Sequence, residues 1–248
     1  MGAYAGRGVH GQVVHALGAR IVGGRIGEGE TLDVGALGAE LDVSQTVMRE
    51  ALKVLAGKGL TDARQRRGTF VRARAHWNLL DADVIRWRME TGDGERLLRD
   101  LTDVRWIVEP AAARRAAVHR TDADLAALDA ALDAMGRARA DASAAAEADV
   151  AFHRALLAAS GNELLGRMDL LLEPGLRVRD RVVHAHADAD DPVPSHRAVL
   201  EAIRQQDAGR AESAMLELLA KAAEDVRAAG VPGAGPGKSE VPGISSGS

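Results

Sequence analysis

The sequence predicts a mainly α protein in two parts, in which three short helices and a β-hairpin precede an all-α helical bundle. Two observations lead to this fold class. Extended segments around a glycine-containing turn are predicted only near residues 60–72, after three segments with helical periodicity. From about residue 93 to residue 230 the chain is rich in Ala and Leu, with helical periodicity and almost no strand pattern. We therefore expect six or seven helices packed as a bundle in the second part.

The first part begins with two short helices. Four apolar residues at helical spacing predict an amphipathic helix over residues 9–23: Val13, Val14, Leu17 and Ile21. A Gly-rich loop over 27–32 leads to a short helix over 33–40, and the turn 41–43 follows. These two helices are expected to form the platform of a third.

The third helix is predicted to run from its N-cap Ser44 to about residue 58, because a serine hydroxyl accepts from the free N–H groups of the first turn. Its buried face is predicted to consist of Val47, Ala51, Leu52 and Leu55. The opposite face is narrow, polar and basic, and comprises Gln45, Thr46, Arg49 and Lys53. Such a face can enter a DNA major groove, where Arg and Gln read guanine and adenine edges.

A β-hairpin is predicted after the third helix, with strands over 60–64 and 69–72. Arg66 and Arg67 lie at its tip beside Gly68 and have no core to join, so contact with phosphates or with a minor groove is their natural use. Three short helices and a hairpin form the winged helix-turn-helix layout. The charges taken alone leave a solvated helix and loop as an equal alternative.

Four regions are therefore predicted: a DNA-binding domain over 1–75, a connector over 76–92, the helical domain over 93–229 and a disordered tail over 230–248. The connector is predicted to be a helix that packs between the domains, with one apolar face formed by Trp77, Leu80, Val84 and Trp87. The predicted bundle helices are 93–119, 122–139, 143–160, 162–186, 195–207 and 210–228. Their expected starts are Thr121 with Asp124, Ser143, Asn162 and Ser195, their stops are Gly161 and Gly209, and Pro110 and Pro174 should kink or break their helices.

The charge is distributed unevenly between the two parts. Residues 1–75 hold 11 Lys and Arg against 7 Asp and Glu, a net charge of +4, whereas the rest holds 21 against 29. The first part alone has the sign that attracts a polyanion. The absence of cysteine excludes disulfide frameworks and thiolate zinc fingers, and the sequence contains neither a signal-peptide pattern nor a membrane-span pattern. We expect a soluble cytoplasmic protein.

Three candidate metal ligands are predicted to point into the bundle. Asp149 and His153 are four residues apart on one helix, and His196 is in register with the apolar face of another. The first two alone favour a salt-bridged structural pair. Convergence of all three favours a metal site, and their oxygen and nitrogen donors suit Zn, Ni, Mn or Fe. Arg105 is predicted to be buried and needs an anionic partner, which is either Glu109 one turn on or the carboxylate of a ligand.

The segment 31–72, with "SQTVMREALKVLAGKGL" and "RRGTFV", resembles the winged helix-turn-helix of the GntR superfamily of bacterial transcription regulators. It carries the usual family residues at Ser44, Arg49, Glu50, Ala51, Leu52, Leu55, Gly59, Leu60, Gly68, Phe70 and Val71. It departs at Gln45, where the family usually has a second Arg. The resemblance implies an operator-binding protein whose base preference differs at that contact.

The phrases "LTDVRWIVEPAAARRAA", "EADVAFHRALLAASGN" and "SHRAVLEAI" resemble the FCD effector-binding domain of the FadR branch of that superfamily. The resemblance implies metal ligands at Asp149, His153 and His196, and a carboxylate contact at Arg105. The family's last histidine is replaced by Leu218, which implies either a three-ligand site with room for effector oxygens or a site that binds the metal weakly or not at all. The connector and this replacement resemble the galactonate-operon repressors, which implies a sugar acid as effector.

The favoured hypothesis is a dimeric repressor released by such an acid, with two recognition helices in successive major grooves. A metal-dependent hydrolase or lyase with a basic appendage is the alternative, because three ligands and an open position also describe a catalytic zinc site. No general base is predicted beside the ligands, which disfavours the enzyme. A nucleoid-type binder without an effector is the third possibility.

Overall fold

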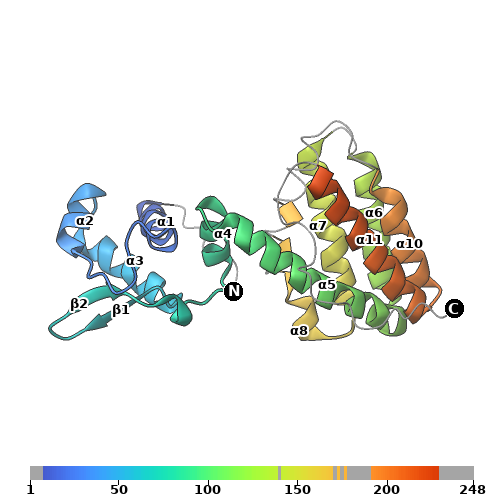
Figure 1. The fold of residues 1–248 in the computed structure, drawn as a ribbon, viewed down its shortest axis with the longest axis horizontal. Coiled ribbons are helices and arrows are strands. Elements are labelled where there is room, and N and C mark those ends of the chain that lie inside the picture. Colours follow the sequence, from blue (N-terminus) through green and yellow to red (C-terminus); the bar gives the residue numbers. More distant parts are fainter. Residues whose placement is uncertain (1–7, 139–140, 170–171, 174–175, 178–190, 229–248) are drawn as a thin grey trace. The chain divides into compact units, whose positions relative to one another are not determined.

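The computed structural model describes residues 8–138, 141–169, 172–173, 176–177 and 191–228. In this part of the chain the fold is mainly α with one two-stranded antiparallel sheet, which confirms the predicted fold class (Figure 1). The chain divides between Leu97 and Leu98 into two compact units. The predicted tail over 230–248 lies outside the described residues. No described helix is both long and apolar enough to cross a lipid bilayer.

The first unit contains the predicted succession of three helices and a hairpin. Its elements are α1 Val9–Val22, α2 Val34–Glu40, α3 Gln45–Gly57, β1 Thr61–Arg64, β2 Gly68–Val71, the 3-10 helix η1 Arg74–His76 and α4 Ala82–Glu90. The side chain of Asp33 caps α2 by accepting from the Ala36 N–H, and Ser44 caps α3 by accepting from the Val47 N–H. Each cap satisfies a free N–H group of a first helical turn, which is why both helices begin at these residues.

The hairpin is held on its outer side by a segment that the sequence predicted as loop. β1 and β2 pair in an antiparallel register with Thr61 opposite Val71. The Leu32 N–H donates to the Thr69 carbonyl at 2.8 Å, and the Val71 N–H donates to the Glu30 carbonyl at 2.9 Å. Thr31 forms a bridge with Phe70. The chain after α1 therefore pairs with β2 and fixes the base of the hairpin.

The connector helix α4 packs on α1, within the first unit. The ring of Trp87 is completely buried and lies against Gly18, where a Cβ atom would come within 2.4 Å of it. Its Nε1–H donates to His15 Nδ1 at 2.9 Å. The prediction of one apolar helical face from Trp77 to Trp87 was wrong in its first half, because the helix begins only after its N-cap Asp81 and Leu80 is exposed.

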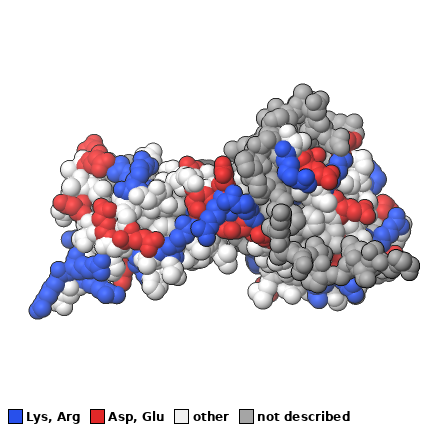
Figure 2. Space-filling model, viewed as in Figure 1, with Lys and Arg blue, Asp and Glu red and all other residues white. Residues whose placement is uncertain are grey.

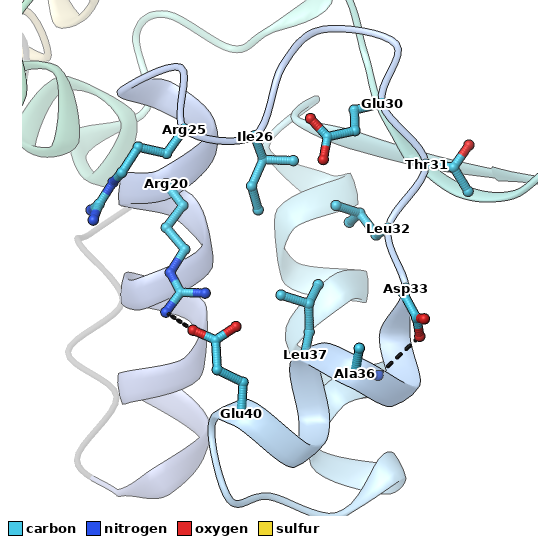
Figure 3. A pocket seen from close by; sticks show the side chains of 10 residues that line it. All are labelled: Arg20, Arg25, Ile26, Glu30, Thr31, Leu32, Asp33, Ala36, Leu37 and Glu40. Carbon is cyan, nitrogen blue, oxygen red and sulfur yellow. Dashed lines mark hydrogen bonds and ion pairs between the residues drawn. The ribbon is translucent and has the colours of Figure 1, made fainter.

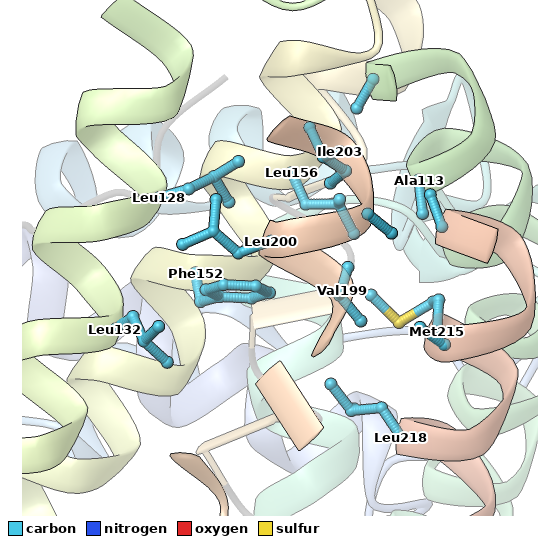
Figure 4. Packing of buried hydrophobic residues seen from close by; sticks show 14 of the residues in the cluster. Ala113, Leu128, Leu132, Phe152, Leu156, Val199, Leu200, Ile203, Met215 and Leu218 are labelled. Atoms are coloured by element: carbon cyan, nitrogen blue, oxygen red, sulfur yellow. The ribbon is translucent and has the colours of Figure 1, made fainter. Parts of the chain in front are cut away.

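The second unit is the predicted bundle. Its described helices are α5 Gly94–His119, which begins in the last residues of the first unit, α6 Asp122–Arg137, α7 Ala142–Ala159, α8 Glu163–Gly166, α10 Val193–Arg204 and α11 Ala208–Ala228. Side chains of α5, α6, α7, α10 and α11 meet in one apolar core (Figure 4), which includes Ala113, Leu128, Phe152, Leu156, Leu200, Ile203 and Met215. This core holds α7 and α10, which carry the candidate ligands, against each other.

Two of the predicted helix starts were wrong. Thr121 and Asp124 do form the predicted capping box of α6. Asp141, rather than Ser143, caps α7, because its carboxylate accepts from two N–H groups of the first turn. α10 begins before Ser195, where prolines occupy the cap and the first turn, positions that suit their fixed φ.

The predicted helix stops were partly correct. Gly161 follows α7 with φ +66°, as a helix stop requires. Gly209 lies inside α11, and Gln206 with φ +58° makes the turn before it. α5 continues through Pro110 without a break. The helix predicted over 162–186 is interrupted by a turn after Gly166, and its last part and Pro174 lie outside the described residues.

Candidate functional sites: DNA interface and metal centre

The polar face of α3 is at the surface. Gln45, Thr46, Arg49 and Lys53 are exposed, whereas Met48, Ala51, Leu52 and Leu55 are buried in the core of the first unit. Lys53 forms an ion pair with Glu50, Nζ to Oε1 at 2.7 Å, on the same face. Packing of the apolar face against α1 leaves the residues predicted to read DNA free to meet a duplex.

The two arginines of the hairpin tip differ in their surroundings. Arg66 is exposed and has a left-handed backbone with φ +69°. The guanidinium of Arg67 lies 3.8 Å from the ring centroid of Phe70 and donates from Nη2 to the Gly29 carbonyl at 2.9 Å. Figure 2 shows the basic side chains gathered over the β1–β2 hairpin. Arg67 thus ties the hairpin to the segment beside it, a role that the sequence did not reveal.

Lys58 fastens the end of α3 to the start of α4. Its ammonium group is buried and lies 2.9 Å from Asp81 Oδ1 and 2.7 Å from Asp83 Oδ2. Burial alone would lower the pKa of Lys58, but the hydrogen bonds to Asp83 and Asp81 outweigh it and raise the pKa above its usual value. Lys58 therefore stays charged and links the recognition helix to the connector.

A surface pocket of the first unit lies between α1, α2 and the segment that joins them (Figure 3). Its charged residues are largely engaged: Arg20 donates to Glu40 at 2.7 Å, and Asp33 caps α2. None of the candidate metal ligands lines it. This pocket is therefore separate from the polar cluster of the second unit.

The structure brings the three predicted ligands together in the second unit. Asp149 and His153 lie on α7 and His196 lies on α10, and all three are at most 4% exposed. One ligand atom from each lies within 4.8 Å of the others. His196 Nε2 is 3.0 Å and His153 Nε2 is 3.7 Å from the same atom, Asp149 Oδ1.

The surroundings of the histidines fit a bound cation. His196 Nδ1 lies 2.8 Å from the Pro192 carbonyl, which can only accept, so this nitrogen carries the proton and Nε2 faces Asp149. Burial lowers the pKa of His153, but Glu109 and Asp149 together raise it to about 9. A carboxylate oxygen and an imidazole lone pair repel each other unless a proton or a metal ion lies between them. The donor set of one oxygen and two nitrogens suits a divalent metal.

The sequence left two partners open for Arg105, Glu109 or the carboxylate of a ligand, and in the structure Arg105 contacts Glu109. Its Nε donates to Glu109 Oε1 at 2.7 Å and its Nη2 to Oε2 at 3.3 Å, and Nη2 also lies 3.2 Å from His153 Nε2. Glu109 Oε2 lies 3.0 Å from His153 Nδ1 as well. Burial raises the pKa of Glu109, but Arg105 and His153 outweigh it and lower the pKa to about 2. The contact between Glu109 and His153 was not predicted, because it joins α5 to α7.

Comparisons with known proteins agree with these two units. Residues 10–71 match the model of the bacterial regulatory proteins of the gntR family, and residues 100–221 match that of the FCD domain. The chain is 35% identical over 212 residues to the galactonate operon transcriptional repressor of Escherichia coli (strain K12), which covers 84% of this chain and 93% of that protein. The chain belongs to the GntR family.

Two further proteins are similar to this GntR-family chain. The HTH-type transcriptional regulator LutR of Bacillus subtilis (strain 168) is 33% identical over 213 residues, covering 83% of this chain and 95% of its own. A solved structure of Lar, which controls expression of the Listeria monocytogenes agr system, has a TM-score of 0.61 at 17% identity and covers 89% of this chain and 98% of its own. The latter likeness shows the fold alone.

Family membership makes this protein a DNA-binding transcription regulator and not an enzyme. The winged helix-turn-helix binds operator DNA, and the FCD domain takes a small-molecule effector. Glu147, the acidic residue closest in sequence to Asp149, is exposed and forms an ion pair with Arg177.

Proposed function

We propose that the protein is a homodimeric repressor that a small carboxylic acid, such as the sugar acid galactonate, releases from its operator. The observation that carries the proposal is the buried cluster of Asp149, His153 and His196 beside Arg105 inside an FCD domain. It combines metal-ligand donors with a guanidinium, which are the groups that a hydroxy acid binds. The similarity to a galactonate operon repressor supports this class of effector.

In this proposal α3 enters the major groove and the hairpin contacts the backbone or minor groove. The contacting residues are Ser44, Gln45, Thr46, Arg49, Lys53, Arg66 and Gly68, and Arg67 holds the hairpin in position. The exposure of Arg49 at the centre of this face supports its use as the base-reading arginine. The operator preference differs from the family's at Gln45.

The metal in the proposal is a divalent Zn, Ni, Mn or Fe ion held by Asp149, His153 and His196. When bound, it supplies a Lewis acid to which carboxylate and hydroxyl oxygens of an acid can coordinate. Leu218, at the position of the family's last histidine, is buried in the apolar core. Three protein ligands leave coordination positions for the effector. The positively charged guanidinium of Arg105 lies 3.2 Å from His153, where it can pair with the carboxylate of a bound acid.

Dimerisation follows from the need to read two half-sites with two recognition helices. The partner is a second copy of this chain, and α5 offers a face for it. Ile107 and Val118 are 74% and 60% exposed and lie eleven residues apart, on the same side of the helix. Ile107→Asp is expected to give a monomer in sedimentation, whereas Leu164→Asp, at a site 79% exposed on α8, is expected to leave the dimer intact. An unchanged Ile107→Asp dimer would assign the interface elsewhere.

Operator affinity with and without acids tests the proposal as a whole. A duplex selected from a random pool is titrated with metal-loaded protein in the presence of galactonate and of other sugar acids. One acid is expected to weaken binding at least tenfold, and Asp149→Ala together with His153→Ala to abolish that response while operator binding persists. Unchanged affinity with every sugar acid would leave the proposed effector class without support.

A salt-bridged cluster without a metal is the second reading, and the 3.0 Å contact between His196 and Asp149 favours it. The two readings differ in one measurement. Metal analysis of protein treated with chelator and then reconstituted is expected to give one ion per chain. A chain that takes up no metal and still responds to the acid would favour the salt-bridged cluster.

A further inference from the structure

Glu109 is a buried carboxylate that neither the predicted ligand set nor the DNA interface includes. It is 0% exposed and lies on α5, one turn after Arg105. Its Oε1 accepts from Arg105 Nε at 2.7 Å, and its Oε2 lies 3.3 Å from Arg105 Nη2 and 3.0 Å from His153 Nδ1. One carboxylate therefore contacts both Arg105, which is proposed to bind the effector, and His153, which is proposed to bind the metal.

The contact fixes which side of the His153 ring faces the other ligands. A carboxylate beside Nδ1 requires a proton on that nitrogen, because two lone pairs would otherwise face each other. Nε2 then carries the lone pair, and it lies 3.2 Å from Arg105 Nη2 and 3.7 Å from Asp149 Oδ1. A histidine that binds a metal through one nitrogen commonly gives its other N–H to a carboxylate, and loss of that partner typically weakens metal binding 10–100-fold.

The same carboxylate decides how an anion can meet Arg105. Nε and Nη2 of the guanidinium are already directed at Glu109. Nε and Nη2 contact Glu109 and His153, so an incoming carboxylate would meet the guanidinium at the edge that bears Nη1. Glu109 also balances the arginine charge. The described cluster with a divalent ion then has a net charge of +1, from Arg105, Glu109, Asp149 and the ion, which one carboxylate neutralises.

We propose that Glu109 is a positioning residue that orients His153 for the metal and offers Arg105 to a monocarboxylate rather than to a dianion. This inference rests on the proposed metal site. Glu109 joins α5 to α7 in the buried cluster, so that loading of the metal and binding of the acid act on the same side chain. Removing the charge of Glu109 is expected to weaken metal binding and to shift the effector preference of the site towards doubly charged acids.

The test compares full-length wild type with Glu109→Gln, using Zn²⁺ alone in competition with a chromophoric chelator. Glu109→Gln is expected to bind Zn²⁺ 10–100-fold more weakly. Glu212→Gln is the matched control, because its carboxylate pairs at 2.9 Å with Arg114 on α5, the helix that also carries Glu109, and this variant is expected to bind Zn²⁺ as the wild type does. Equal affinities of wild type and Glu109→Gln would overturn the inference, whereas a wild type without Zn²⁺ binding would overturn the proposed metal site.

A second measurement separates positioning from a general loss of structure. With Co²⁺ in place of Zn²⁺, the visible absorption bands report the ligand geometry, and Glu109→Asp keeps the charge while its carboxylate is one methylene shorter. Altered bands in this variant, at an unchanged melting temperature of the metal-free chain, are expected from a reoriented His153 ring. Bands identical to those of the wild type in Glu109→Asp would contradict a positioning role. If Glu109→Gln fails to fold, this variant decides the question.

Discussion

The two arginines at the hairpin tip are expected to differ in how DNA binding depends on salt. Arg66 is exposed at a turn position with φ +69°, where it can approach a phosphate. Each phosphate contact contributes about 0.9 to the slope of log affinity against log salt, and the proposed dimer has two hairpins, so Arg66→Ala should reduce the slope by about 1.8. Between 50 and 200 mM salt the affinity of this variant should therefore fall about 12-fold less than that of the wild type.

Arg67 is expected to act through the shape of the hairpin. Its guanidinium lies 3.8 Å from the Phe70 ring centroid and donates to the Gly29 carbonyl. A cation–π contact of about 1 kcal/mol and a hydrogen bond of about 1 kcal/mol hold each hairpin in place, so Arg67→Ala should weaken operator binding up to about 30-fold per hairpin, or about 900-fold for the proposed dimer. The salt slope should stay at the wild-type value, because no phosphate contact is lost.

Fluorescence anisotropy across a salt series measures both quantities, and Arg67→Lys provides the control. Lysine keeps the charge but lacks the planar fork that stacks on Phe70 while donating to Gly29. Arg67→Lys is therefore expected to bind as weakly as Arg67→Ala. Should lysine restore the affinity, or should Arg67→Ala reduce the slope as much as Arg66→Ala does, the structural role inferred for Arg67 would be refuted.

Three further changes test the first unit. Lys58→Met should lower the free energy of unfolding by up to about 3 kcal/mol in calorimetry, because it removes the cation beside Asp81 and buried Asp83, although Asp83 keeps its ion pair with Arg86, and adding Asp83→Asn should recover part of the loss. Gly59→Ala should cost at least about 2 kcal/mol, since φ is +77° and its Cβ would lie 2.3 Å from the His76 carbonyl oxygen; a wild-type melting temperature would contradict this. Burial raises the pKa of Asp93, but hydrogen bonds from Arg74 and Arg88 outweigh it and hold the pKa below its usual value of 3.8. Ionised Asp93 therefore stabilises the folded chain above this pH, and its contribution is lost as the pH falls further. In Asp93→Asn, the free energy of unfolding should depend less steeply on pH below about 4.

Periodicity and caps predicted the elements of the fold because they are local properties. Ser44 and the Thr121 box begin their helices through hydrogen bonds that span three residues, and these positions can be recognised in sequence. Leu80 misled the prediction of the connector. It continues the apolar spacing of a helix, but Asp81 accepts from the N–H groups of Asp83 and Val84 and so starts the helix after Leu80.

The candidate metal ligands could be predicted from the sequence, but the side chains that contact them could not. Asp149, His153 and His196 were recognisable because helical spacing places donor types on an inward face. The role of Glu109 needed the tertiary structure, since His153 is 44 residues away on another helix. Lys58 was hidden for the same reason, because a lysine at a helix end is ordinarily solvated and its burial depends on carboxylates of a later segment.

Regulation requires that the effector have different affinities for DNA-bound and released geometries of the protein. Arg105 and Glu109 both lie on α5, which begins only four residues after α4 ends. α4 is in turn held to α3 through the buried pairs of Lys58. A change in α5 on effector binding would therefore reach the recognition helix through covalent continuity and one buried ion cluster. Weakening that cluster should leave effector affinity for the free protein intact while reducing its effect on DNA binding, which separates transmission from sensing.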